Sequence, residues 1–112
     1  MKAIKNQHAD SVVLTLRGDF DAYVVVPFLE EISKIENQGI HKVVVNMRLV
    51  KFVNSSALGA MIRARRELQT GEGDLLVSSP SPAVLEAMEA LGIDQLFTIH
   101  TDDDSALDAI VD

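Results

Sequence analysis

The chain has 112 residues, 47% of them hydrophobic, and no cysteine; ten lysines and arginines stand against seventeen aspartates and glutamates, a net charge of −7. This length and apolar content predict that residues 1–112 form a single domain with its own core. The lack of cysteine excludes disulfides, thiolate metal sites and cysteine nucleophiles. The acidic balance argues against direct nucleic-acid binding, which depends on neutralising phosphates.

Targeting and membrane signals are not evident in the sequence. The apolar stretch within residues 1–8 is too short for a signal peptide. No run approaches the ~18 apolar residues that a membrane span needs. We therefore expect a soluble, cytoplasmic protein without membrane insertion.

The first elements are predicted to be two strands and a helix. Candidate strands at 3–8 and 12–18 flank the turn residues Asp10-Ser11, so these two strands can form a hairpin. Pro27 suits the first turn of a helix, because its missing N–H costs nothing there. Apolar residues then recur at helical spacing, and Gly39 is a suitable stop.

A buried strand and a second helix are predicted next. The β-branched run at 43–45 does not alternate with polar residues, as expected for a strand covered on both faces. A helix begins at the Ser55-Ser56 pair, and glycines 71 and 73 close it. The run at 75–77 is another strand of the buried type. The core face of the helix comprises Ala57, Met61, Ala64 and Leu68.

The last third of the chain predicts two more helices and a short edge strand. Ser81 can cap a third helix, with Pro82 at its first position. Residues 96–99 form the candidate edge strand. Three aspartates, 102–104, then place negative charge on the first turn of a final helix, where the helix dipole favours it. The apolar stripe of the third helix comprises Val84, Leu85, Met88 and Leu91, and that of the last helix Leu107, Ile110 and Val111.

The predicted order is therefore β-β-α-β-α-β-α-β-α, an α/β fold. Strands that are joined through helices should be parallel, so only the opening pair can be antiparallel. We expect a mixed sheet of about four to five strands with about four helices.

The sequence lacks the residue constellations of common catalytic sites. No phosphate-cradling glycine loop or nucleophile elbow occurs. His8, His41 and His100 are isolated and lack a second ligand at metal-like spacing. Asp19 and Asp21 are better suited to a turn than to paired acid–base chemistry. We therefore expect a protein that is not an enzyme and that binds no cofactor and no metal.

The junction at Asn54-Ser55-Ser56-Ala57, where a strand region leads into a helix, allows two interpretations. A serine at a helix start is ordinarily a cap that accepts a free backbone N–H. The same position is also a prepared anion site, so a phosphoserine there is stabilised by free N–H groups and the helix dipole. Such added charge can reverse the binding of a partner.

Four segments in order resemble the STAS domain family, particularly single-domain bacterial anti-sigma factor antagonists. Together they cover nearly the whole chain. The third is similar to the family's Phe-x-Asp-Ser-Ser-Gly-Leu-Gly motif. The segments are Leu16-Arg17-Gly18-Asp19-Phe20-Asp21, Val43-Val44-Val45-Asn46-Met47, Phe52-Val53-Asn54-Ser55-Ser56-Ala57-Leu58-Gly59 and Leu91-Gly92-Ile93-Asp94-Gln95-Leu96-Phe97.

The resemblance implies a partner and a switch. In such antagonists a serine of this motif is phosphorylated by an anti-sigma factor that is itself a serine kinase. The unphosphorylated form captures that kinase and frees the sigma factor, and phosphorylation ends the capture. By position the phosphoacceptor is Ser56, with Ser55 as its neighbour and cap, and Asp21 matches the family's acidic residue near the site.

Three residues depart from the family pattern. Asn54 and Asn46 stand where the family has aspartate, and Ala57 stands where it has glycine. Asn54 keeps the hydrogen bonds of an Asx turn but removes a negative charge beside the acceptor. Ala57 adds a methyl group where a partner backbone approaches. These departures weigh against phosphorylation more than against the fold.

Two further features are candidates for a docking surface. Tyr23 to Val26 is an apolar run that is either part of the core or an exposed patch beside Ser56. Arg63, Arg65 and Arg66 are either a solvated helix face or a basic rim for an acidic partner. The predicted partner-binding residues are Asp21, Tyr23, Asn54, Ser55, Ser56, Ala57 and Arg63.

Three hypotheses of function follow. The first is an anti-sigma factor antagonist, a monomer or weak homodimer, with Ser56 as its switch. The second is a STAS-type accessory subunit of a larger complex, such as a lipid-transport ATPase or a sensory scaffold, without a phospho-switch. The third, a small-molecule binder or enzyme, has no polar constellation to support it.

Overall fold

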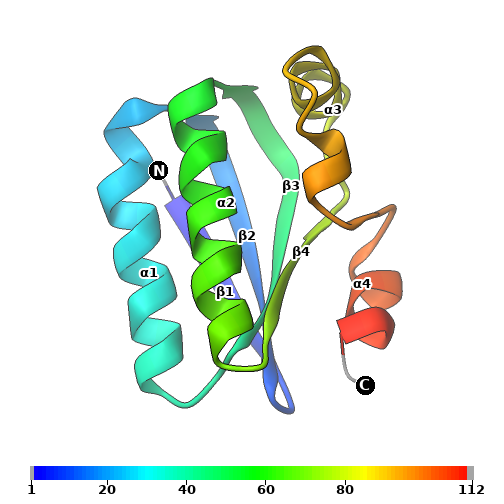
Figure 1. The fold of residues 1–112 in the computed structure, drawn as a ribbon. Coiled ribbons are helices and arrows are strands. Elements are labelled where there is room, and N and C mark those ends of the chain that lie inside the picture. The colour runs from blue at the N-terminus through cyan, green and yellow to red at the C-terminus, as the bar shows by residue number, and fades with distance from the viewer. Residues whose placement is uncertain (1, 111–112) are drawn as a thin grey trace.

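The computed structural model describes residues 2–110, which form a five-stranded sheet and four α-helices (Figure 1). The strands are β1 (Lys2–His8), β2 (Ser11–Phe20), β3 (Lys42–Val53), β4 (Asp74–Ser78) and β5 (Ile99–His100). The helices are α1 (Val25–Asn37), α2 (Ser55–Thr70), α3 (Pro82–Ala90) and α4 (Asp103–Ile110), with short 3-10 helices η1 (Ala22–Val24) and η2 (Asp94–Leu96). The predicted α/β order is confirmed.

The strands follow one another across the sheet in chain order, β1-β2-β3-β4-β5. The hairpin of β1 and β2 is antiparallel, and every later pair is parallel. The predicted mixed sheet is therefore confirmed. Because β2, β3 and β4 run the same way, their carboxyl ends meet at one edge of the sheet.

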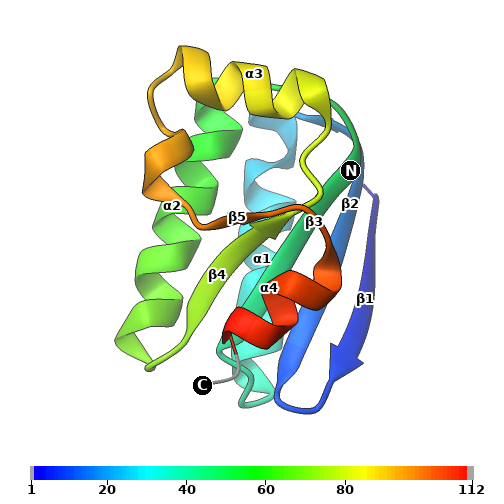
Figure 2. The same cartoon turned by 90° about the vertical axis from the view of Figure 1, so that its right-hand side faces the viewer.

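The sheet separates a large core from a small one. On the front face, α1, α2 and α3 contribute to a cluster that includes Leu14 and Leu16 of β2 (Figure 1). On the rear face, α4 packs against Val13, Val44 and Leu76 (Figure 2). Alternate residues of β2 thus enter different cores, which explains why its buried stretch does not alternate with polar residues.

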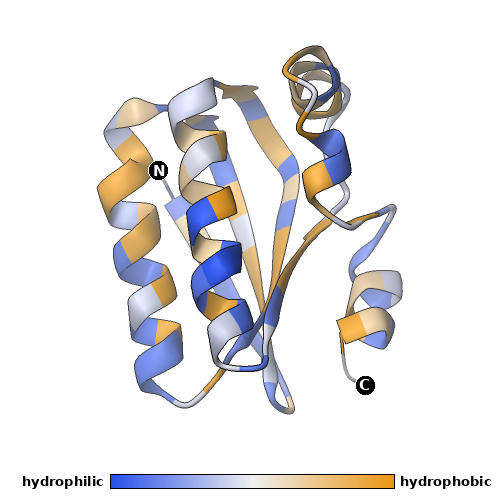
Figure 3. Cartoon of the chain, viewed as in Figure 1, coloured by the Kyte–Doolittle hydropathy of each residue, from blue (hydrophilic) through white to orange (hydrophobic). Residues whose placement is uncertain are grey.

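The helix α2 has the amphipathic face that its periodicity predicts. Ala57, Met61, Ala64 and Leu68 are fully buried. Hydrophilic residues recur along the turns of α2 in Figure 3, whereas β4 beside it is largely hydrophobic. Among the described helices, none is both long and apolar enough to cross a membrane.

Several boundaries differ from the prediction. Pro27 lies in the first turn of α1, as predicted, but helical structure already begins at η1, because the carboxylate of Asp21 accepts the N–H of Tyr23, and η1 leads directly into α1. The edge strand is only two residues long and starts at Ile99, since η2 occupies Asp94–Leu96.

The apolar stripe of α3 is narrower than predicted. Val84 and Met88 are buried, but Leu91 lies beyond the helix and is half exposed. The predicted cap at Ser81 is confirmed by its bond from the Val84 N–H. Of the predicted stripe of α4, Ile110 is buried and Leu107 packs at the edge of the rear core, while Val111 lies outside the described residues.

Candidate functional site

The site lies at the carboxyl edge of β2 and β3. Phe20 and Val53 pair at the ends of these parallel strands, and the Asn54 N–H donates to the Phe20 carbonyl at 3.3 Å. Asp21 and Asn54 are the residues that follow. The fold therefore brings Asp21 beside the start of α2, although more than thirty residues separate the two in sequence.

Asn54, not Ser55, caps α2. Its backbone is extended, and its side-chain oxygen accepts the Ala57 N–H at 3.0 Å. The prediction that Ser55 is the cap is therefore wrong. Asparagine and serine are about equally good caps, so three adjacent candidates in the sequence could not be ranked by residue type alone.

The two serines occupy the first turn of α2 and are exposed. Within residues 2–110, neither hydroxyl takes part in a hydrogen bond. Their backbone N–H groups have no partner within the helix, because the first turn lacks acceptors. A sixteen-residue helix also presents the positive end of its dipole here. This arrangement can stabilise an added anionic group.

An apolar patch lies beside the serines at the start of α1. Tyr23 is 91% exposed and Val26 is 64% exposed, whereas Val24 is buried and Val25 is half-buried. Both interpretations of the Tyr23–Val26 run are thus partly correct, because helical geometry turns its members to different sides. The half-buried carboxylate of Asp21 is held by the Tyr23 N–H at 3.0 Å.

Two departures from the family motif do not act at this surface. Ala57 is fully buried in the front core, so the prediction that its methyl meets a partner is wrong. Asn46 is also buried, and it lies eight residues before Asn54 on β3, roughly 26 Å along the strand. Its replacement of aspartate therefore has no direct bearing on charge at Ser56.

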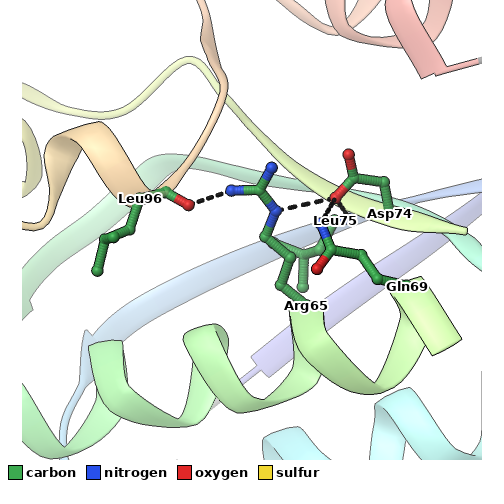
Figure 4. Close-up of polar contacts among 5 residues, drawn as sticks. All are labelled: Arg65, Gln69, Asp74, Leu75 and Leu96. Carbon is green, nitrogen blue, oxygen red and sulfur yellow. Dashed lines mark hydrogen bonds and ion pairs between the residues drawn. The ribbon is translucent and has the colours of Figure 1, made fainter.

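The three arginines of α2 have different roles. Arg65 is partly buried and bonded within the molecule. Its Nε donates to Asp74 at 2.9 Å, and its guanidinium also donates to the Leu96 carbonyl (Figure 4). The same Asp74 oxygen accepts the Leu75 N–H at 2.8 Å. Arg65 thus ties α2 to β4 and η2, while Arg63 and Arg66 are exposed.

The surface beside the site has an open depression and not an enclosed cavity. A depression of about 540 Å³ borders Asp21 and Tyr23. Within the described part of the chain, no group of three histidine, aspartate or glutamate side chains is arranged to hold a metal ion. The geometry offers an open surface with free hydroxyls, which suits docking and modification.

Comparison with known proteins identifies the family. The model of the STAS domain matches residues 2–106. The chain belongs to the STAS domain family. The resemblance inferred from the four sequence segments is thereby confirmed.

This STAS domain is similar to proteins named as anti-sigma factor antagonists. An anti-sigma F factor antagonist from Lysinibacillus sphaericus is 27% identical over 85 residues, which cover 75% of this chain and 73% of the relative. A crystal structure of an anti-sigma factor antagonist from Mycobacterium paratuberculosis has a TM-score of 0.86 at 21% identity, covering 99% of this chain and 94% of that one.

SpoIIAA, an anti-sigma factor antagonist from Bacillus, is a further structural neighbour. Its unphosphorylated form has a TM-score of 0.81 at 23% identity and covers 99% of this STAS domain and 100% of SpoIIAA. Its phosphorylated form has a TM-score of 0.73 at the same identity, covering 96% and 98%. At this level of identity the likeness shows a shared fold.

Proposed function

We propose that this STAS domain is an anti-sigma factor antagonist. It binds an anti-sigma factor that is a serine kinase and so frees a sigma factor, and phosphorylation of Ser56 ends the binding. The observation that supports this most is the free, exposed Ser56 hydroxyl in the first turn of α2, because Asn54 has taken the cap. Relatives named as antagonists, one of them known in a phosphorylated form, support the same function.

The switch follows from charge and exposed apolar area. Transfer of the terminal phosphoryl group of ATP to the Ser56 oxygen releases ADP and the hydroxyl proton. It adds a charge of about −1.5 to −2 to this side chain. The free N–H groups of the first turn stabilise that charge within this chain. A partner that packs on Tyr23 and Val26 would have to desolvate the phosphate, so its binding weakens.

Neighbouring residues define the docking surface. We assign it to Asp21, Tyr23, Asn54, Ser55 and Ser56, with Arg63 about two turns beyond Ser56 on the same face of α2. Asp21 acts by holding η1, which fixes the exposed Tyr23 beside the serines. We further infer that the protein acts in the cytoplasm as a single domain, monomer or weak homodimer, without enzymatic activity of its own.

A kinase assay with paired serine variants tests this function. The wild type, Ser55→Ala and Ser56→Ala are incubated with the cognate kinase and ATP, and the products are analysed by peptide mass spectrometry. We expect one phosphate on the wild type and on Ser55→Ala and none on Ser56→Ala. The adjacent serine is a matched control, since it is also exposed and, within residues 2–110, likewise makes no hydrogen bond.

Binding is measured in parallel by titration calorimetry with the same kinase. Ser56→Asp should weaken it by about tenfold or more, which corresponds to about 1.4 kcal/mol. Phosphate on Ser55→Ala and Ser56→Ala alike, or full binding by Ser56→Asp, would refute the switch.

A permanent accessory subunit is the second candidate function. The favouring observation is the uncharged cap at Asn54, which lacks the family's aspartate beside the acceptor. Such a subunit needs no cycle of phosphorylation. Stoichiometric co-purification with an ATPase subunit or a sensory scaffold protein, with no binding to a sigma-regulating kinase, would favour it over the antagonist.

A further inference from the structure

The rear face of the sheet is only partly covered. The short helix α4 packs over Val13, Val44 and Leu76, toward the amino ends of the parallel strands. Among the helices that the structure describes, none lies over the opposite ends of β1 and β2 on this side, which faces the viewer in Figure 2. Side chains that point to the rear there are open to solvent.

Strand register identifies these side chains. Arg17 and Asp19 alternate along β2 with Leu16 and Phe20, which are buried in the front core, so both point to the rear. Across the strands, Arg17 pairs with Leu49 and Lys2, and Asp19 pairs with Phe52. Leu49 is 39% exposed and Phe52 is 51% exposed.

Irregular pairing between β2 and β3 adds two cations. The register shifts twice, leaving additional residues of β3 opposite the Thr15–Arg17 and Gly18–Asp19 steps. Arg48 and Lys51 fall in these two steps and are exposed. Both line a hollow of about 490 Å³ on this surface. We call it the rear hollow; its lining is Arg17, Gly18, Asp19, Arg48, Leu49 and Lys51.

The charge of the rear hollow is opposite to that of the molecule. Of the ten lysines and arginines, four form ion pairs within residues 2–110. The six others include Arg17, Arg48 and Lys51 of the hollow and the adjacent Lys2. One carboxylate, Asp19, lies among them. A chain with net charge −7 therefore concentrates unpaired positive charge at one place.

The rear hollow also continues into the docking surface. The depression that borders Asp21 and Tyr23 shares Arg17, Gly18 and Asp19 with it. An extended segment could thus run from the exposed serine edge around β2 onto the rear face.

We propose that the rear hollow binds an acidic peptide segment with apolar side chains, contributed by a protein partner. Carboxylates meet the cations, and apolar side chains cover Leu49 and Phe52. A short segment interacts mainly with the local charge, because interactions between exposed charges are screened beyond about 8 to 10 Å.

An anionic membrane is a disfavoured occupant, since its broad surface would face the acidic remainder of the molecule. A second copy is disfavoured because two of its clustered aspartates are engaged, Asp102 by the Ser105 N–H and Asp103 by Asn46 and Ser78.

Nuclear magnetic resonance with a synthetic peptide tests the proposal without kinase or sigma factor, so its outcome is independent of phosphorylation at Ser56. The probe is a short peptide in which glutamates alternate with leucines, titrated into the ¹⁵N-labelled full chain. We expect amide shifts at residues 17–19 and 48–52 and affinity that falls steeply with added salt. Peptides with glutamine for glutamate, or serine for leucine, should bind more weakly.

Two double variants localise the binding. Arg48→Glu/Lys51→Glu should weaken it by about tenfold or more, as loss of two ion pairs and their replacement by repulsion imply. Lys34→Glu/Arg66→Glu is the matched control, since it reverses two exposed cations on α1 and α2 outside both the rear hollow and the docking surface, and it should bind as the wild type does. Thermal melts check that each variant is folded. The neutral variant Arg48→Gln/Lys51→Gln removes the two charges without reversing them, so it tests the loss of binding if the reversed variant does not fold.

Four outcomes would overturn the proposal. Equal loss in both charge-reversal variants, or no peptide shifts at all, would show that the rear hollow is not a specific site. Co-sedimentation with phosphatidylserine vesicles that Arg48→Glu/Lys51→Glu abolishes, without peptide binding, would assign the face to a membrane. Concentration-dependent line broadening of the same amides without peptide would assign it to a second copy.

Discussion

At the scale of single residues, Asn54 caps α2, whereas the proposed phosphoacceptor is Ser56, so different residues of the junction have the structural and the chemical role. Its amide oxygen takes the Ala57 N–H, which leaves the hydroxyls of Ser55 and Ser56 free. An aspartate would make the same bond but would add a negative charge beside the acceptor. The asparagine therefore preserves the start of α2 without placing a negative charge beside Ser56.

Removal of the cap should destabilise the protein measurably. Asn54→Ala loses the bond to the Ala57 N–H, and we expect the free energy of unfolding to fall by about 1 kcal/mol. Asn54→Asp keeps the bond and adds favourable charge at the helix start, so it should be at least as stable as the wild type. Urea unfolding followed by circular dichroism measures both. Ser55→Ala is the control and should change stability by less than about 0.5 kcal/mol; a loss equal to that of Asn54→Ala would mean that Ser55 shares the cap.

At the scale of elements, one carboxylate joins α4 to the rear of the sheet by hydrogen bonds, beside the apolar contacts of the rear core. Asp103 accepts from Asn46 Nδ2 at 2.8 Å and from the Ser78 hydroxyl at 2.6 Å. Both donors are buried, and the Asn46 oxygen accepts the Arg48 N–H at 2.9 Å. A carboxylate at position 46 would face that of Asp103, which explains why asparagine stands where the family has aspartate.

A charge swap tests this attachment. Asn46→Asp opposes two carboxylates and loses a donor, so we expect about 2 to 3 kcal/mol less stability near neutral pH. Adding Asp103→Asn returns one amide and one carboxylate to the pair, and should recover much of the loss. Urea unfolding of the single and double variants measures the coupling; additive losses would contradict it.

The start of α4 has an acid-sensitive hydrogen bond. The Ser105 N–H donates to Asp102 at 2.7 Å and lowers the pKa of that carboxyl from 3.8. Folding lowers the pKa of Asp102, so the bond stabilises α4 fully at pH values above the pKa that this carboxyl has in the unfolded chain. The stabilisation is lost as the pH falls through the lower pKa of the folded state. In the wild type, α4 should therefore loosen first in acid. Amide exchange across Asp103–Ile110, compared with α2, detects this.

At the scale of the whole molecule, the sequence predicted what depends on periodicity and missed what depends on tertiary contacts. The buried face of α2 and the parallel order of the strands follow from local patterns. Leu91 has the helical spacing of a core residue, but its helix ends before it can pack. The basic rear hollow was not predicted, because irregular pairing of β2 with β3 brings its cations together.

A charge at Ser56 should act on partners without altering the fold. The side chain is exposed and has no hydrogen bond to lose, and the α2 residues that anchor it are buried behind it. Ser56→Asp should therefore keep the wild-type free energy of unfolding or raise it by up to about 1 kcal/mol, since it places a carboxylate at a helix start. Its amide shifts should stay within the first turns of α2 and the adjoining residues 20–24.

Ser33→Asp is the matched control, because it adds the same charge to an exposed serine in the middle of α1, three residues from Glu30. It lacks the helix-start benefit and meets a like charge, so it should be slightly less stable than the wild type. Urea unfolding and ¹⁵N–¹H spectra of both variants decide the point. Shifts of Ser56→Asp that reach α4 across the sheet, or a loss of stability greater than that of Ser33→Asp, would mean that the switch works through the fold rather than at the surface.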